Sequence, residues 1–278
     1  MAREEQGLTY DAFSELAVAQ EINRGFVKQV GIRPGDAVLD IGCGHGNSVE
    51  KILEALRTDR GWEGQIVAID PDPVALSFAR RRFGPEHPIE FAECSAQDLD
   101  RLGFPDGAFD VSVFANGIHY LRSQDDFMRA LRAVRRITSR TFALWSAFVK
   151  EAYVGKTPRF AGLWVAKAYE LLGVDSKARS RSENLQERDA GGYVAALRQA
   201  GFSHVEHMLA TFDLPPEVYE AIARFRDYVR NALPDIPSRP DITIELRSEK
   251  LFAAVRLVYE RLGVAALPRN WLYVRADV

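Results

Sequence analysis

An acidic residue followed by spaced glycines is the part of this sequence best suited to ligand chemistry. The segment VLDIGCGHG, residues 38–46, places Asp40 two residues before Gly42, which is followed by Gly44 and Gly46. Glycines at the end of a strand let the backbone approach a ligand closely. A second carboxylate, Asp70, ends the next apolar run, where it can accept hydrogen bonds from two ribose hydroxyls. This pattern predicts a nucleoside-binding site.

The glycine spacing and the charge of Asp40 indicate what the rest of the ligand looks like. A dinucleotide fingerprint has the form G-x-G-x-x-G and places a pyrophosphate at a helix N-terminus. This loop has the form G-x-G-x-G instead. An anion such as Asp40 is a poor neighbour for a pyrophosphate and a good one for an ammonium group. We therefore expect a nucleoside with a positively charged end.

Short apolar runs alternate with segments of helical period from Ala37 to Phe148, which is typical of a parallel sheet with helices on both faces. Ligands of such sheets bind beyond the carboxyl ends of the strands, where the acidic and glycine positions fall. The predicted fold class is α/β, a Rossmann-like, doubly wound, mostly parallel seven-stranded sheet. The expected strands in this half cover residues 37–41, 65–70, 89–94, 109–115 and 142–149.

The second half predicts a helical cap interrupted by returns to the sheet. Its pattern suggests a helix around residues 164–172, a polar loop or flap over 175–188, a strand over 204–212 and a single helix from Pro215-Pro216 to Val229. The expected organisation is a core with an N-terminal helix over 1–150, a cap insert over 151–186, a return to the core over 187–213, a second cap insert over 214–266 and a final core strand over 267–278.

Composition excludes several classes of partner. The 278 residues are 47% hydrophobic and 27% charged with a formal net charge of -3, so no positive field exists to hold nucleic acid. The most apolar stretch, Phe142 to Val149, is far shorter than the roughly 18 residues of a membrane span. The N-terminal MAREEQGLTY lacks an export signal, and Cys43 and Cys94 lack metal-type spacing. We expect a cytoplasmic protein without a metal site, nucleic-acid partner or membrane partner, and the oligomeric state stays open.

Through these motifs the sequence resembles the class I S-adenosylmethionine (SAM) dependent methyltransferases, especially the small-molecule group with the motif E/D-x-G-x-G-x-G. VLDIGCGHG is similar to the first motif of that family, and FDVSVFANGIHYL is similar to the motif at the end of its fourth strand. The resemblance runs from about Leu8 to Phe212. It implies methyl transfer to oxygen, carbon or nitrogen of a small organic acceptor, with SAM as cofactor and S-adenosylhomocysteine as product.

The resemblance also implies roles for individual residues. Asp40 and the glycine loop would hold the methionine part, Asp70 the ribose, and the Ala96-Gln97 backbone the adenine edge. Ser95 stands where many relatives have an acid, and the segment Phe114–Gly117 lacks the Asn/Asp-Pro-Pro-aromatic motif of amide methyltransferases, which disfavours amide methylation. The full set expected at the cofactor is Asp40, Gly42, Cys43, Gly44, Gly46, Asp70, Pro71, Ser95, Ala96, Gln97, Ala115 and Asn116.

Two residues are candidates for catalysis. His119, just past the fourth strand, could serve as a general base towards a hydroxyl nucleophile, or could simply pack under the cap. Tyr10 resembles the N-terminal tyrosine that closes over the cofactor in related enzymes, or is an ordinary aromatic on an amphipathic helix. The candidate residues for a substrate pocket, which could equally form the core of the cap, are Tyr120, Trp145, Tyr153 and Trp164.

Three other functions stay open at this point. A SAM-using enzyme of another reaction type, such as an intramolecular cyclisation, would have the same cofactor residues. A NAD(P)-dependent oxidoreductase uses the same general fold, but the glycine spacing and Asp40 disfavour it. A non-catalytic SAM-binding regulator would retain binding without turnover.

Overall fold

The structure, a computed structural model, describes residues 13, 15–175 and 188–278, which form two compact units. The sheet unit contains residues 21–152, 188–210 and 271–278, and the helical unit contains the described residues 13, 15–20, 153–175 and 211–270. Two strands, β8 (Ser203–Leu214) and β9 (Leu267–Asp277), contribute residues to both units. Within the described part of the chain, no helix is long and apolar enough to cross a membrane.

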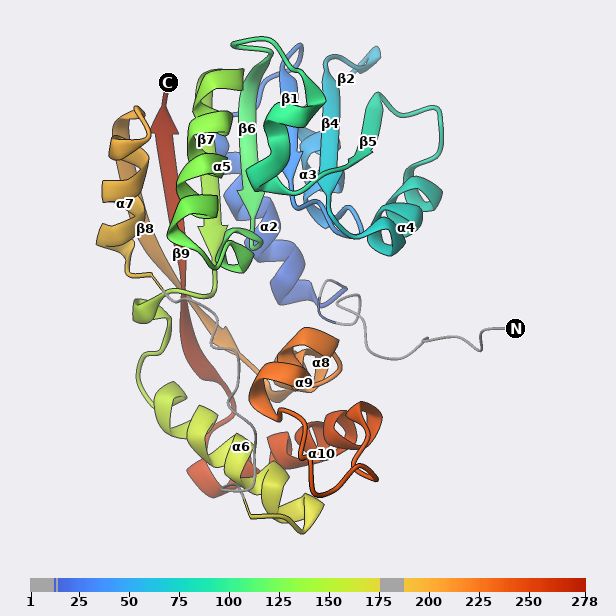
Figure 1. The fold of residues 1–278 in the computed structure, drawn as a ribbon, viewed down its shortest axis with the longest axis vertical. Coiled ribbons are helices and arrows are strands. Elements are labelled where there is room, and N and C mark those ends of the chain that lie inside the picture. The colour runs from blue at the N-terminus through green and yellow to red at the C-terminus, as the bar shows by residue number, and fades with distance from the viewer. Residues whose placement is uncertain (1–12, 14, 176–187) are drawn as a thin grey trace. The chain divides into compact units, whose positions relative to one another are not determined.

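The sheet has seven strands in the order β5-β4-β1-β6-β7-β9-β8 (Figure 1). The pairs of β1 with β4 and β6, of β4 with β5 and of β6 with β7 are parallel, whereas β9 runs antiparallel to β7. This arrangement confirms the predicted Rossmann-like, mostly parallel seven-stranded sheet. The other strands are β1 (Ala37–Ile41), β4 (Gln65–Asp70), β5 (Ile89–Glu93), β6 (Phe109–Ala115) and β7 (Thr138–Ser146).

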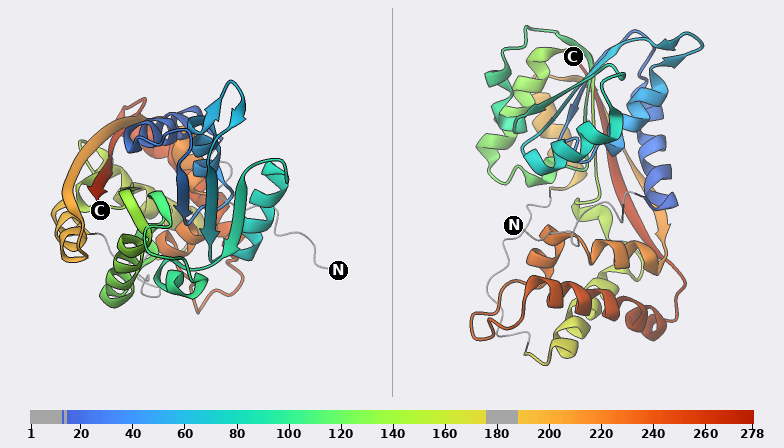
Figure 2. Two further views of the ribbon diagram at one scale, coloured as in Figure 1. Left: turned by 90° about the horizontal axis from the view of Figure 1, so that it is seen from above. Right: turned by 90° about the vertical axis from the view of Figure 1, so that its right-hand side faces the viewer.

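Helices cover both faces of this sheet. The right-hand view of Figure 2 shows α5 and α7 on one face and α2 and α3 on the other. Two of these helices begin at capping side chains: Asp72 accepts a hydrogen bond from Val74 N at 2.8 Å, and Ser123 accepts one from Asp126 N at 3.0 Å. The helices with most residues in this unit are α2 (Ala17–Val30), α3 (Asn47–Ala55), α4 (Pro73–Phe83), α5 (Gln124–Ile137) and α7 (Ala190–Gln199), with 3-10 turns η1 (Ala96–Leu102), η2 (Ile118–Tyr120) and η3 (Lys150–Ala152).

The strand register brings the chemically interesting ends together. Ile41 of β1 pairs with Ile69 of β4 and with Phe114 of β6, so these three strands end at nearly the same level. Asp70 is the last residue of β4, and Ala115 is the last residue of β6. The glycine loop, Asp70 and Asn116 therefore lie along one edge of the sheet.

The bounds predicted for the fifth strand, 142–149, were wrong. Strand β7 starts at Thr138, directly after α5, although its first residues are polar. Thr138 is buried because its hydroxyl donates to Val134 O at 2.7 Å and hydrogen-bonds with Ser112 Oγ at 2.7 Å. Hydropathy alone therefore misses the strand start. The short hairpin of β2 (Arg57–Thr58) and β3 (Gly61–Trp62) was also not predicted.

The helical unit packs around one long helix, α10 (Ile244–Leu262), which contacts the other three helices. Its core contains large aromatic side chains, among them Phe160 and Trp164, whose rings stack with centroids 5.4 Å apart. The indole of Trp164 donates to Leu251 O at 2.7 Å, which satisfies its buried N–H. The other helices are α6 (Thr157–Leu172), α8 (Pro216–Ile222) and α9 (Arg226–Ala232).

The single helix predicted from Pro216 to Val229 is wrong, because the structure breaks it into α8 and α9. Phe225 has extended backbone angles and precedes α9. The hydroxyl of Ser248 donates to Ala223 O at 2.8 Å, so a side chain of α10 satisfies a carbonyl at the end of α8. Most of the polar loop predicted over 175–188 lies outside the described residues.

Candidate functional site

The glycine loop is held against β4 by its backbone. Gly42 N and Cys43 N both donate to Ile69 O, at 2.8 and 2.9 Å. Gly44 has a φ of 52°, in the region that favours glycine, and a Cβ added to it would meet nothing within 4 Å. The backbone at Gly44 therefore faces open space, as a loop that approaches a ligand must.

Asp40 is a completely buried carboxylate, and one of its two oxygens accepts a hydrogen bond within the protein. The hydroxyl of Ser48, in the first turn of α3, donates to Asp40 Oδ2 at 2.5 Å. The other oxygen, Oδ1, is buried and has no hydrogen-bond partner among the described residues. Burial raises the pKa of Asp40 to about 7; the Ser48 hydrogen bond lowers it, and the charge of Asp70 raises it. The site therefore presents a buried acceptor that a ligand ammonium group would satisfy.

Asp70 is fixed in orientation by two backbone donors. Its Oδ2 accepts from Gly44 N at 2.8 Å and its Oδ1 accepts from Asp72 N at 2.9 Å. Burial raises the pKa of Asp70, and these two hydrogen bonds lower it. Each carboxylate oxygen has a second lone pair, so the pair of oxygens can still accept two hydroxyls. Asp70 thus joins the glycine loop to the end of β4 and keeps capacity for a ribose.

The expected adenine loop follows β5. Cys94 N donates to Asp70 O at 3.1 Å, which places the start of this loop beside the end of β4. Ser95 is extended and precedes η1, Ala96 is buried, and Gln97 is half-buried.

Two other residues expected at the cofactor differ in exposure, since Pro71 is exposed and Cys43 is buried. Burial raises the pKa of the Cys43 thiol, which makes it an unreactive spacer.

Asn116 holds the ends of β6 and β7 together. It adopts a positive φ of 51°, its N–H donates to Trp145 O at 2.9 Å, and its Oδ1 accepts from Ala147 N at 3.1 Å. Ala115, the preceding residue, is half-buried and pairs with Trp145 in the register. Asn116 therefore has a structural function at this edge, independent of any ligand.

His119 is buried and its ring contacts two aromatic rings. Its ring centroid lies 4.4 Å from that of Tyr120 and 4.0 Å from that of Phe148. Tyr120 itself is 42% exposed. These contacts favour the packing role among the two roles expected for His119. Tyr10, the other catalytic candidate, lies outside the described residues.

The four predicted pocket residues belong to different units. Tyr120 and Trp145 lie in the sheet unit, and Trp145 is buried with its ring 5.6 Å from that of Phe26. Tyr153 and Trp164 lie in the helical unit, where Trp164 is a core residue. The sheet unit alone thus brings together the predicted cofactor residues, and the substrate candidates divide between the two units.

Sequence reasoning missed Ser48 and Phe148. Ser48 lies on the helix that follows the glycine loop, eight positions after Asp40, and a hydroxyl in that first turn is the only sequence signal for its contact with Asp40. Phe148 follows β7 and gives no sequence signal for its ring contact with His119. Both contacts depend on how separate elements meet in space.

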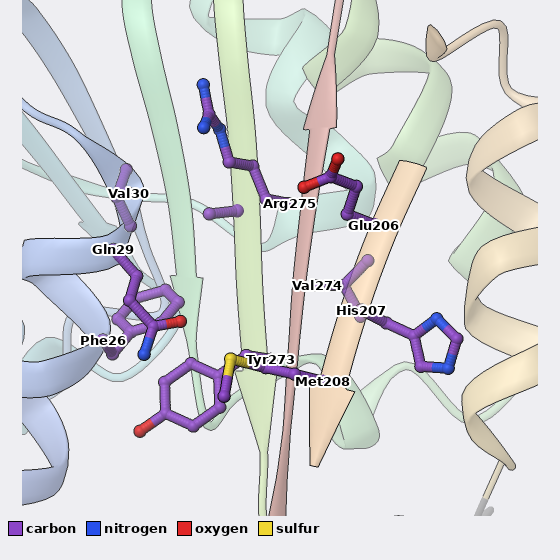
Figure 3. Close-up of a pocket in the computed structure, with 10 residues that line it drawn as sticks. Phe26, Gln29, Val30, Glu206, His207, Met208, Tyr273, Val274 and Arg275 are labelled. Carbon is purple, nitrogen blue, oxygen red and sulfur yellow. The ribbon is translucent and has the colours of Figure 1, made fainter. Parts of the chain in front are cut away.

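A pocket of about 270 Å³ lies elsewhere in the sheet unit, between α2 and the strands β7, β9 and β8. Figure 3 shows Phe26 and Gln29 of α2 facing Tyr273 of β9. None of the predicted site residues lines this pocket, so it is separate from the Asp40 edge.

The raised pKa of Asp40 predicts how the ligand-free protein responds to pH. Below about pH 3 the carboxyl is protonated in both the folded and the unfolded state, so its burial costs nothing. As the pH rises from 3 towards 7 the unfolded state ionises first, and folding loses stability that reaches on the order of 4 kcal/mol above pH 7. Asp40→Asn should remove this loss, so urea unfolding should show the variant gaining about 3 kcal/mol more on the wild type at pH 8 than at pH 4.5.

The control for this measurement is Asp59→Asn, at an exposed position, which should show no such pH-dependent difference. A constant difference between Asp40→Asn and wild type at both pH values would contradict the raised pKa.

The comparisons with known proteins agree with this geometry. A family model described as a methyltransferase domain matches residues 38–140. The chain is 29% identical over 134 residues to the ubiquinone/menaquinone biosynthesis C-methyltransferase UbiE of Stenotrophomonas maltophilia (strain R551-3), which covers 46% of this chain and 50% of the relative. The chain thus spans about half the length of that curated relative.

Solved structures show the same fold. A protein of Anabaena variabilis assigned as a methyltransferase of an antibiotic biosynthesis pathway superposes with a TM-score of 0.60 at 15% identity, covering 93% of this chain and 97% of that one. Phosphoethanolamine N-methyltransferase 2 of Haemonchus contortus, solved with phosphomonomethylethanolamine and S-adenosylhomocysteine, superposes with a TM-score of 0.53 at 14% identity, covering 92% and 52%. Residues 38–140 of this chain are thus similar to a methyltransferase domain, and the fold of the chain is similar to the folds of these two structures.

Proposed function

We propose that this protein transfers the methyl group of SAM to a small organic acceptor and releases S-adenosylhomocysteine. The observation that supports this proposal most is the buried Asp40 carboxylate, whose Oδ1 has no hydrogen-bond partner among the described residues, beside a glycine loop that is open at Gly44. A buried acceptor of this kind fits a ligand with an ammonium group, which SAM has. The similarity to a ubiquinone/menaquinone biosynthesis C-methyltransferase supports a small acceptor rather than a macromolecule.

The residues that would hold SAM all lie in the sheet unit. Asp40 Oδ1 would accept from the ammonium group, and the loop from Gly42 to Gly46 would line the methionine part. Asp70 would accept the two ribose hydroxyls while its backbone donors keep it in place. The backbone of Ala96 and Gln97 would meet the adenine edge, with Ser95 and Pro71 beside it.

Bound SAM would supply an electrophilic methyl group on a sulfonium. For a displacement of this kind the protein contributes mainly by aligning the reactants and excluding water. The tilted ring contacts of His119 with Tyr120 and Phe148 support a role in shaping this edge of the sheet.

Isothermal titration with SAM, S-adenosylhomocysteine and NADH tests the cofactor. The wild type should bind the first two with micromolar affinity and give no signal with NADH. Asp70→Ala should weaken SAM binding at least about tenfold, because hydrogen bonds to a charged group contribute about 1.5–3 kcal/mol each. Glu90→Ala, at an exposed position of β5, is the matched control and should bind as the wild type does.

An NADH signal without SAM binding would overturn the proposal in favour of an oxidoreductase. SAM binding without formation of S-adenosylhomocysteine across a broad acceptor panel would favour the non-catalytic regulator. Conversion of an added compound into an isomer with SAM unchanged would favour the cyclisation.

His119→Phe separates the packing role of His119 from a role as base. A phenyl ring preserves the ring contacts with Tyr120 and Phe148, so turnover should stay within about threefold of the wild type, with unchanged SAM affinity. Removal of a general base would instead reduce turnover about 100-fold or more. The measurement is the rate of S-adenosylhomocysteine formation with an acceptor from the panel, and His207→Phe, on the exposed side of β8, is the control.

A further inference from the structure

Ser48 of α3 directs its only hydroxyl proton at Asp40. The hydroxyl donates to Asp40 Oδ2 at 2.5 Å, a short distance that is typical of a hydroxyl bonded to an ionised carboxylate. Ser48 is 5% exposed and Asp40 is fully buried, so water does not compete for this hydrogen bond. Many helical serines donate to a carbonyl of the preceding turn. Ser48 donates instead to a side chain of β1.

The turn before α3 fixes the position of Ser48. Gly46, the N-cap residue of α3, has a φ of 87°, in the region that favours glycine. A Cβ added to Gly46 would clash with the ring of Phe83, so this turn lies closely against α4. Gly46 O accepts from Glu50 N at 3.1 Å, and this bond starts the helix. The glycine loop therefore sets the backbone from which Ser48 reaches Asp40.

The titratable groups of the glycine loop and of β4 give Asp40 no stabilising partner. Burial raises the pKa of Asp40 most, the Ser48 hydrogen bond lowers it, and the charge of Asp70 raises it further. The thiol of Cys43 stays neutral because burial raises its pKa. His45 of the same loop acts electrostatically on Asp70. On this side Asp40 therefore meets a neutral thiol and a second carboxylate.

Helix α3 and strand β6 also supply no cation to the carboxylate. Lys51, one turn after Ser48, pairs with Glu50 and Glu54 of its own helix at 3.3 and 2.7 Å. The last three residues of β6 are apolar. Among the described residues, Ser48 is thus the one side chain that donates a hydrogen bond to Asp40. Its removal would leave the buried carboxylate without a side-chain donor.

We propose that Ser48 is a positioning residue of the cofactor site, whose hydroxyl fixes the Asp40 carboxylate and keeps it charged while Oδ1 stays available to the ligand ammonium. The terminal torsion of an aspartate is broad, so a bond to Oδ2 narrows the orientations that Oδ1 can take. A hydrogen bond to the charged form of a carboxyl also favours that form. The inference rests on the proposed function in one respect, because it takes the ammonium to be that of SAM.

The pH dependence of urea unfolding tests this role in the ligand-free protein. In the wild type the loss of stability with rising pH should level off near pH 7, where folded Asp40 ionises. Ser48→Ala removes the donor to the charged form, so the levelling-off should move up by about one pH unit. The same substitution in the Asp40→Asn background should give no such shift. A serine needed only for packing would instead lower the free energy of unfolding equally at every pH.

Two further variants serve as controls. Ser112→Ala removes a hydroxyl on β6 that is also buried and that hydrogen-bonds with Thr138 Oγ1 at 2.7 Å, a hydroxyl rather than a carboxylate. This variant should keep the levelling-off where the wild type has it. Ser48→Thr keeps a hydroxyl donor at the position and should restore the levelling-off to within about half a pH unit of the wild type.

Calorimetric titration at two pH values tests the role of Ser48 towards the ligand. Ser48→Ala should weaken SAM binding about eightfold at pH 6.5 and about threefold at pH 7.5, because a pKa raised by about one unit reduces the ionised fraction of Asp40 more at the lower pH. 5′-Methylthioadenosine is the same nucleoside without the amino acid part, so it has no ammonium to reach Asp40. It should bind the wild type and Ser48→Ala equally.

An unshifted levelling-off in Ser48→Ala, equal weakening of SAM at the two pH values, or equal weakening of SAM and 5′-methylthioadenosine would each overturn this inference. The two proposals can fail separately. Absence of SAM binding by the wild type refutes the proposed function, and the unfolding profiles then still decide whether Ser48 keeps Asp40 ionised. Normal SAM binding with unshifted profiles refutes the role of Ser48 alone.

Discussion

The burial of the Asp40 carboxylate is the constraint on which the candidate site depends. A carboxylate that is fully removed from water loses its hydration, and one hydroxyl from Ser48 replaces only part of it. The remaining cost appears as a pKa raised to about 7 and as an Oδ1 without a partner in the described chain. A fold that places such a group at the end of its central strand gains stability when a cationic ligand arrives.

The surrounding elements keep that acceptor accessible and oriented. The glycine loop is fastened to Ile69 by two backbone hydrogen bonds, and Asp70 fastens Gly44 from the other side. Parallel pairing of β1 with β4 and β6 sets these groups at one edge of the sheet. The helical unit has a separate polar feature in Arg269, which sits among aromatic side chains.

The sequence predicted those strands and helix starts that depend only on residues close together along the chain, namely apolar runs and capping side chains. Strands β1, β4 and β6 lie where apolar runs predicted them, and the caps at Asp72 and Ser123 follow from side chains that bond their own helix starts. The start of β7 could not be predicted, because Thr138 is tolerated inside only through hydrogen bonds to Ser112 and Val134. The break between α8 and α9 likewise depends on Ser248 of a distant helix.

The candidate site likewise contains residues that can be identified from their spacing along the chain and contacts that cannot. Asp40, the glycines and Asp70 were identifiable because their spacing along the chain reflects one loop and two strand ends. The contact of Ser48 with Asp40, the ring contact of Phe148 with His119 and the surroundings of Arg269 arise between separate elements, for which a single sequence gives no spacing to recognise.

The central claim is that a buried Asp40 ionises to hold the ammonium of SAM. Calorimetric binding of SAM at pH 6.5 in two buffers of different ionisation enthalpy measures the linked protons. With a pKa of about 7, about three quarters of a proton should leave Asp40 on binding, and none should leave in Asp40→Asn. SAM binding without proton release, or the same release in the variant, would contradict the account.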